Sequence, residues 1–207
     1  MDNKKIIVAL DGMNRNDAVK IAKILRGKVW GFKVNDLLYN NGSIVTQLKK
    51  YGKVFADAKL HDIPNTVANS VKKLSKAGAD IITVHASGGI EMMKAAKINS
   101  GKSKIIAVTV LTSTKLNSSK QVLNLVKDAM KASMDGLVCS GKEVNALKRL
   151  TGTRSMIKVV PGIRPNTYKT KDDQKRIVTP TEALKLGADL LVIGRPITSG
   201  KFQKKIF

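Results

Sequence analysis

The sequence predicts an α/β protein that folds as a (β/α)8 (TIM) barrel, a single domain over residues 1–207. Three observations lead to this prediction. Eight short apolar runs alternate with stretches of helical periodicity, which is the element count of such a barrel. Apolar residues make up 43% of the chain and aromatic residues only 4%, and a core of Ile, Val, Leu and Ala suits parallel strands covered by helices. Polar residues recur where the apolar runs end, and the functional sites of barrels lie at that end.

The predicted strands are short runs dominated by Ile, Val and Leu. In chain order they cover residues 6–10, 29–34, 54–59, 81–85, 105–111, 136–139, 157–160 and 190–193. Between them lie amphipathic segments such as 65–77 and 121–133, whose apolar residues recur at three- and four-residue spacing. An open doubly wound sheet is the competing architecture, but no G-x-G-x-x-G follows any strand. We see no internal repeat, low-complexity stretch or linker.

Composition restricts the class of protein. The net charge of +23 on its own indicates nucleic acid or another polyanion as a partner. The lysines are spread along the whole chain, however, and few aromatic residues are present for base stacking. We therefore expect a solvated basic surface and no specific nucleic-acid partner.

The chain shows no targeting or membrane signal. Its first residues run directly into a strand-like segment, and no apolar run approaches the ~18–20 residues that cross a bilayer. The single Cys139 reads as a small core residue in a reducing compartment, although a catalytic thiol is the alternative. We expect a cytoplasmic protein that does not bind membranes.

Charged and hydrogen-bonding residues stand at the predicted strand ends. In chain order they are Asp11, Lys33, Asp57 with Lys59, His85, Thr112, Cys139, Pro161-Gly162-Ile163-Arg164 and Gly194-Arg195. In a barrel all of these positions meet at one face, where the loops after the strands build the site. Such a density of polar groups after buried runs indicates an enzyme active site.

The run from Asp57 to Thr66, D-A-K-L-H-D-I-P-N-T, is the most informative of these. Side chains two apart in a strand share a face, so Asp57 and Lys59 are expected to point the same way. Asp62 follows in the turn that opens the next helix. A carboxylate beside an ammonium at the end of a buried strand is costly unless the charges have a function. The structural alternative is an ion pair with Asp62 as the helix N-cap.

The same ten residues resemble the signature D-x-K-x-x-D-I-P-x-T of the orotidine 5'-phosphate decarboxylase family. The resemblance runs from Val8-Ala9-Leu10-Asp11 to Ile193-Gly194-Arg195-Pro196, nearly the whole chain. It implies a carboxy-lyase that converts orotidine 5'-phosphate to UMP and CO2 in de novo pyrimidine biosynthesis. It also implies that the enzyme needs no metal and no organic cofactor.

The resemblance further implies an alternating array of charges, Lys33, Asp57, Lys59 and Asp62, in which the second subunit of a homodimer supplies Asp62. Lys59 would stabilise the negative charge that develops at C6 of the pyrimidine and then protonate it. Asp57 would lie close to the substrate carboxylate, disfavour it and orient Lys59. Together with Asp62, Thr66 would reach the ribose in the partner's site.

Other strand ends match the family's substrate contacts. Asp11 and Lys33 would hold ribose hydroxyls, and Thr112 would bond the base. The loops after the last two strands often bind phosphate in barrels, and an arginine there offers a bidentate fork. The polar stretch 166–176 reads as a lid. The resemblance places the remaining contacts at Pro161, Arg164, Gln174, Gly194 and Arg195.

Two rival functions remain. A sugar-phosphate lyase on the same scaffold, such as 3-keto-L-gulonate 6-phosphate decarboxylase or hexulose phosphate synthase, shares D-x-K-x-x-D but needs Mg²⁺. A basic barrel that binds nucleic acid without catalysis is the second. His61 and His85 receive no catalytic role, because two separated histidines do not make a metal site. One departure from the family pattern is Asn35, where a glycine is usual after Lys33-Val34.

Overall fold

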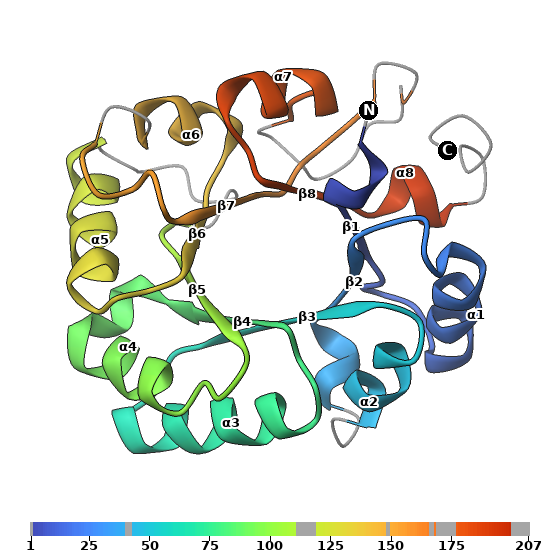
Figure 1. The fold of residues 1–207 in the computed structure, drawn as a ribbon, viewed down its shortest axis with the longest axis horizontal. Helices are drawn as coiled ribbons and strands as arrows, with labels where there is room; N and C mark the ends of the chain where they lie inside the picture. The colour runs from blue at the N-terminus through green and yellow to red at the C-terminus, as the bar shows by residue number, and fades with distance from the viewer. Residues whose placement is uncertain are drawn as a thin grey trace.

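The computed structural model describes residues 2–39, 43–110, 119–147, 150–165, 168 and 177–199. Thr112, Gln174 and most of the predicted lid at 166–176 lie outside these residues. Eight parallel strands pair in the order β1 to β8, and β8 returns to β1, so the sheet is a closed barrel. The predicted (β/α)8 fold is therefore confirmed. Figure 1 shows the helices as an outer ring around the barrel.

Three strands keep their predicted bounds, and the other five shift by one to three residues at one or both ends. The strands are β1 (Ile6–Ala9), β2 (Gly31–Val34), β3 (Lys53–Leu60), β4 (Ile81–His85), β5 (Lys104–Val108), β6 (Gly136–Val138), β7 (Ile157–Val160) and β8 (Leu190–Ile193). Strand β2 begins two residues later than predicted, although Trp30 just before it already donates its backbone N–H to the Ile6 carbonyl at 2.9 Å.

The helices that follow the strands cover the barrel from outside. They are α1 (Arg15–Leu25), α2 (Ser43–Lys49), α3 (Pro64–Lys76), α4 (Gly89–Ile98), α5 (Ser119–Lys131), α6 (Gly141–Leu147), α7 (Pro180–Leu186) and α8 (Arg195–Thr198), with short 3-10 turns η1 (Asn3–Lys5), η2 (Asp36–Tyr39) and η3 (Ala86–Gly88). None of the helices in the described part of the chain has the length and apolar character of a membrane span.

Alternation along the strands divides the core into two clusters. On β1, Ile6 and Val8 face outward into the layer between strands and helices, whereas Ile7 packs inside the barrel with Phe55 of β3. The same period turns Phe32 and Val34 of β2 outward, which leaves Lys33 pointing inward. Charged residues therefore form the uppermost inward layer, above an apolar barrel interior.

A repeated element closes the opposite, amino-terminal end of the barrel. Helices α3, α5 and α7 end in the related sequences K-A-G-A-D, K-A-S-M-D and K-L-G-A-D, whose last residues are Asp80, Asp135 and Asp189. Each carboxylate accepts the backbone N–H of a residue on the preceding odd-numbered strand, at 2.8–2.9 Å. The sequence thus contains a short repeat, contrary to our expectation. In each copy the final Asp stands directly before an even-numbered strand and is bonded to the odd-numbered strand that precedes the helix.

Candidate active site

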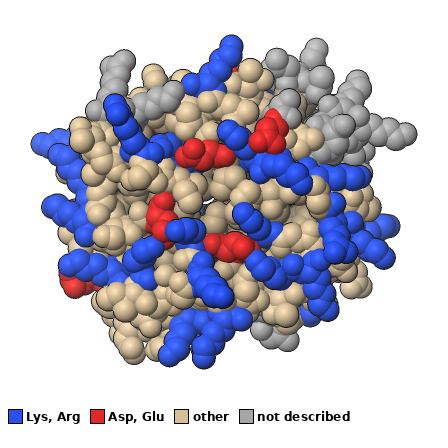
Figure 2. Space-filling model, in the orientation of Figure 1, with Lys and Arg blue, Asp and Glu red and all other residues tan. Residues whose placement is uncertain are grey.

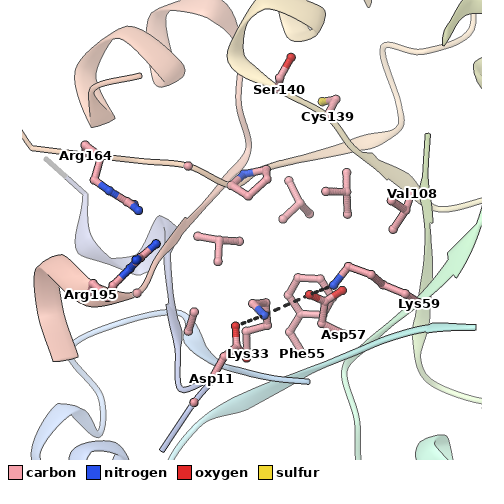
Figure 3. A pocket seen from close by; sticks show the side chains of 18 of the residues that line it. Asp11, Lys33, Phe55, Asp57, Lys59, Val108, Cys139, Ser140, Arg164 and Arg195 are labelled. Carbon is pink, nitrogen blue, oxygen red and sulfur yellow. Dashed lines mark hydrogen bonds and ion pairs between the residues drawn. The ribbon is translucent and has the colours of Figure 1, made fainter. Parts of the chain in front are cut away.

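A cavity of about 490 Å³ opens at the carboxyl ends of the strands (Figure 3). It brings together eight of the predicted site residues from five different strand ends. These are Asp11, Lys33, Asp57, Lys59, Pro161, Arg164, Gly194 and Arg195. The strand-end pattern therefore located the cavity, although residues far apart in the sequence build it.

Two ammonium groups converge on one carboxylate oxygen. Oδ2 of Asp57 lies 2.6 Å from Nζ of Lys59 and 3.1 Å from Nζ of Lys33. Lys33 in turn donates to Oδ2 of Asp11 at 2.5 Å. The order Asp11–Lys33–Asp57–Lys59 is thus a continuous chain of opposite charges along one wall of the cavity (Figure 3).

Local structure sets these positions. Asp11 follows β1 and pairs with Lys33, while Asn14 caps α1, so Asp11 is not a capping residue. Asn35, the departure from the family pattern, donates its side-chain amide to the backbone carbonyl of Asp57 at 2.6 Å. This bond ties the loop after β2 to β3 beside the charged array.

Burial and charge act in opposite directions on the array. Burial by itself would lower the pKa of Lys33, but Asp57 and Asp11 outweigh it and hold that pKa above the ordinary value of 10.5. Burial would raise the pKa of Asp57, but Lys33 and Lys59 hold it below the ordinary 3.8. Both groups are consequently charged at neutral pH. The Lys59 side chain is 31% exposed against 10% for Lys33, so Lys59 presents the more accessible ammonium to the cavity.

Two arginines occupy the opposite side of the cavity. Arg164 follows β7 and is buried, with one guanidinium nitrogen donating to the Ile163 carbonyl and its Cζ 5.6 Å from the Tyr168 ring centroid. Arg195 begins α8 directly after Gly194. Figure 3 shows both guanidinium groups directed toward the cavity, across from Asp57 and Lys59. One side of the site thus carries two cationic groups, and the side that faces it carries a row of alternating charges.

Apolar side chains form the floor between these two sides. They are Phe55, Val108, Val138, Val159 and Val192, each on a different strand. Our sequence prediction did not include them, because an inward valine one layer below a strand end looks like any other core residue. Only the barrel register shows that they touch the cavity.

Asp62 and Thr66 do not line this cavity. Both are exposed, and Asp62 accepts only the adjacent Ile63 N–H among the bonds found for it. The residue at the N-cap of α3 is Ile63, which makes no side-chain capping bond and is itself 65% exposed. The alternative interpretation of Asp62 as the N-cap is therefore wrong.

The structure also bears on the roles considered for Cys139, His61 and His85. Cys139 is buried at the edge of the cavity, and burial raises the pKa of its thiol, which disfavours the nucleophilic thiolate. The rings of His61 and His85 are tilted by 41° to each other, with their centroids 5.5 Å apart. Burial, aided by His61 and Lys59, lowers the pKa of His85. Among the described residues, no three His, Cys, Asp or Glu side chains gather as a metal site would require.

The basic character is distributed over the surface. Figure 2 shows Lys and Arg side chains spread widely over the face seen in Figure 1, with a few carboxylates among them. Several lysines of the described chain pair with acidic groups, as Lys49 does with Asp80 at 2.6 Å.

Comparisons with known proteins agree over nearly the whole chain. The family model described as Orotidine 5'-phosphate decarboxylase / HUMPS family matches residues 4–205. A Carboxydothermus hydrogenoformans protein named orotidine 5'-phosphate decarboxylase is 43% identical, covering 98% of this chain and 92% of the relative. A Pseudomonas fluorescens protein of the same name is 44% identical, covering 93% and 90%. The crystal structure of orotidine 5'-phosphate decarboxylase from Lactobacillus acidophilus superposes with a TM-score of 0.79 at 35% identity, covering 97% of this chain and 94% of that one.

Proposed function

Because the chain belongs to the orotidine 5'-phosphate decarboxylase / HUMPS family, we propose that it converts orotidine 5'-phosphate to UMP and CO2. The observation that carries the proposal is the convergence of Lys33 and Lys59 on one oxygen of Asp57, across the cavity from two arginines. A nucleotide has the matching distribution of charge, with a phosphate at one end and the reacting carboxylate at the other.

The phosphate end belongs at Arg164 and Arg195. Guanidinium groups bind phosphate oxygens through paired, charge-assisted hydrogen bonds. Gly194 also lines the cavity and has no side chain to keep a phosphate away from the backbone beside them. Binding energy from the unreactive phosphate is then available to hold the pyrimidine against the charged array. By resemblance, Gln174 also contacts the phosphate, Thr112 hydrogen-bonds the base, and Pro161 contacts the substrate. Gln174 and Thr112 lie outside the described residues.

The reacting end belongs at Lys59. When the bond between C6 and the carboxylate breaks, CO2 leaves and the electron pair remains on C6. The ammonium of Lys59 stabilises that charge and transfers a proton to C6, and solvent restores the proton to the amine. Asp57 holds Lys59 in place and repels the substrate carboxylate, while Lys33 and Asp11 hold ribose hydroxyls. The apolar floor excludes water from this step, which strengthens each of these interactions.

The active unit in this proposal is a homodimer with shared sites. Asp62 and Thr66 are exposed and lie outside their own cavity. Asp62 is in the turn after β3, next to the exposed, apolar Ile63, and Thr66 is in the first turn of α3. An acidic group placed in this way is available to a neighbouring subunit. Asp62 of each subunit would complete the other's array and contact its ribose together with Thr66. We further propose that the enzyme acts in cytoplasmic pyrimidine biosynthesis and has no specific nucleic-acid or membrane partner.

A Mg²⁺-dependent sugar-phosphate lyase fits the site less well. The curated relatives at 43–44% identity carry the name of the decarboxylase. The ammonium groups of Lys33 and Lys59 already bond Oδ2 of Asp57, and they would repel a divalent cation. The favoured chemistry at this carboxylate is therefore pairing with lysine.

A spectrophotometric assay tests the proposal. Purified protein is mixed with orotidine 5'-phosphate, and the loss of its absorbance is followed with and without excess EDTA. We expect turnover that EDTA does not reduce, with UMP as the product by chromatography. No conversion of orotidine 5'-phosphate, with Mg²⁺-dependent turnover of a 3-keto-sugar or hexulose phosphate instead, would overturn it.

A further inference from the structure

Thr83 of β4 connects the two central residues of the candidate active site. Its side chain is completely buried. Its Oγ1 donates to Oδ1 of Asp57 at 2.9 Å and accepts the backbone N–H of Lys59, also at 2.9 Å. One hydroxyl group thus bonds the carboxylate of one charged residue and the main chain of the other.

The need for this hydroxyl comes from an irregularity in β3. Ala56 pairs with Ile82 and Leu60 pairs with Val84, so three residues of β3 lie opposite the single Thr83 of β4. Within this bulge Lys59 has a φ of +46°, a left-handed conformation that is uncommon for a residue with a side chain. The bulge turns the Lys59 N–H away from a regular ladder, and the hydroxyl of Thr83 takes the place of the missing carbonyl acceptor.

The bonds to Asp57 are divided between its two oxygens. Oδ2 receives the ammonium groups of Lys33 and Lys59, and Oδ1 receives Thr83. A carboxylate held at both oxygens has a fixed plane. Without the Thr83 bond it is free to rotate about its terminal torsion, which would carry Oδ2 away from both lysines.

We propose that Thr83 is a positioning residue, whose hydroxyl fixes the Lys59 backbone and the Asp57 carboxylate together and thereby sets the place of the Lys59 ammonium in the cavity. The proposal rests on the decarboxylase function proposed above. Thr83 does not line the cavity, so it acts through Lys59 and Asp57 and not through the substrate. Its effect should therefore fall on the chemical step and spare substrate binding.

Three variants separate positioning from a structural contribution. Thr83→Val keeps the shape and removes both bonds, and Thr83→Ser keeps the hydroxyl. Thr109→Val is the matched control, since Thr109 is equally buried after the neighbouring β5, and its hydroxyl bonds only weakly to the Val138 carbonyl at 3.4 Å. We expect Thr83→Val to lower kcat by ~30-fold, because two buried polar groups lose their partner. The KM for orotidine 5'-phosphate should change by less than about threefold.

The other two variants should behave like the parent, with Thr83→Ser and Thr109→Val each within about threefold in kcat. A Thr83→Val enzyme with parental kcat would overturn the proposal, and so would a Thr83→Ser enzyme as impaired as Thr83→Val. If Thr83→Val does not fold, Thr83→Cys replaces it, because a thiol hydrogen-bonds weakly. The same loss of kcat is then expected, and parental kcat would again overturn the proposal.

A second measurement does not depend on activity. Amide hydrogen exchange at Lys59 should accelerate by at least about tenfold in Thr83→Val relative to the parent, and not in Thr83→Ser. If amide exchange at Lys59 were unchanged in Thr83→Val, the proposed bond from Lys59 to Thr83 would be overturned as a tether, even in an active enzyme. Parent protein inactive on orotidine 5'-phosphate would instead refute the proposed function, while the exchange data would still report on Thr83.

Discussion

Nζ of Lys59 lies 2.6 Å from Oδ2 of Asp57, and Lys33 approaches the same oxygen at 3.1 Å. The carboxylate therefore holds two ammonium groups at once. Lys33 has a second partner, because its ammonium group also pairs with Asp11. Lys59 is the more exposed of the two and is the one placed to give its proton to a substrate.

Lys59→Ala is accordingly expected to abolish turnover of orotidine 5'-phosphate while the protein stays folded. Lys33, which also lines the cavity and contacts Asp57, is only 10% exposed and is paired with Asp11 as well. Turnover is measured by absorbance and folding by circular dichroism. Lys94→Ala, which removes an exposed lysine paired with Glu91 on α4, should leave both unchanged. Product formation near the parental rate by folded Lys59→Ala would contradict the proton-donor role.

The charged array should also make stability depend on pH in a defined way. The pKa of Asp57 in the folded protein is below its ordinary 3.8, so its stabilising contribution is present above that value and is lost as the pH falls through the folded pKa. The pKa of Lys33 is above 10.5, so its contribution is present below that value and is lost as the pH rises through the folded pKa. The array should contribute fully between about pH 5 and 9.

Asp57→Ala tests this window. Removing one partner from a buried pair leaves charge uncompensated, and we expect a loss of ~3 kcal/mol in unfolding free energy at pH 7, measured by urea denaturation. The difference from the parent should shrink below pH 4. Glu91→Ala, which removes an exposed carboxylate, serves as the control and should cost little at any pH. A difference that did not vary with pH would show that the pairing is not its source.

Much of the fold was predictable because its signal is local. Runs such as Ile81–His85 and Leu190–Ile193 are short, rich in aliphatic residues and directly preceded by an aspartate, and their bounds matched the prediction. The strand-end position of Asp57 and Lys59 was also correct. Their common orientation, however, does not come from simple alternation alone, since a bulge with positive φ at Lys59 intervenes.

Other features depend on register, which the sequence alone does not specify. Thr83 stands within an apolar run and reads as an ordinary core residue. Its role appears only once β4 is aligned with the bulge in β3. The repeat that ends in Asp80, Asp135 and Asp189 was not predicted, for a related reason. Only the first Lys and the final Asp are identical in all three copies, and the Asp carboxylate bonds a backbone N–H of a different strand.

That repeat leads to a stability prediction at Ser133. In the two sibling copies a glycine takes the left-handed position that ends the helix, with φ of +99° at Gly78 and +103° at Gly187, whereas the α5 copy has Ser133 at +56°. Ser133→Gly removes the steric cost of that conformation, which exceeds the entropy that glycine loses. We expect stabilisation by ~0.5–1 kcal/mol in urea denaturation, with unchanged kcat.

The reverse substitution is the control. Gly78→Ser places a side chain at the same helix-ending position, and the nearest atom to its Cβ would be the flexible Lys49 side chain at 3.4 Å, an ordinary contact. Its cost should therefore reflect the backbone alone and be of similar size and opposite sign. Destabilisation by Ser133→Gly would mean that the serine hydroxyl contributes more than its backbone conformation costs.

Arg195→Ala tests the proposed phosphate site. Loss of one arginine–phosphate contact of ~2–4 kcal/mol corresponds to a fall of roughly 30- to 800-fold in kcat/KM. We expect most of it as a higher KM, with a smaller loss of kcat because phosphate binding also helps to hold the substrate for reaction. Arg154→Ala, an exposed arginine before β7 at the other end of the barrel, should leave kcat/KM unchanged. An Arg195→Ala enzyme with parental efficiency would remove Arg195 from the phosphate site.

The last prediction concerns the shared sites of the proposed dimer. In a two-fold dimer each subunit gives its Asp62 to the other's array, so Asp62→Ala and Lys59→Ala should each inactivate when present in both subunits. A mixed dimer contains one site that carries both lesions and one site that carries neither. After complete subunit exchange of equal amounts, half of the dimers are mixed, and about one quarter of all sites should be active. The measurement is turnover of orotidine 5'-phosphate before and after exchange, with the dimer followed by light scattering. Recovery requires that Lys59 and Asp62 of one site come from different chains. If mixed dimers formed but no activity returned, Asp62 would have to act within its own subunit. Its exposed position outside the cavity of that subunit does not support such a role.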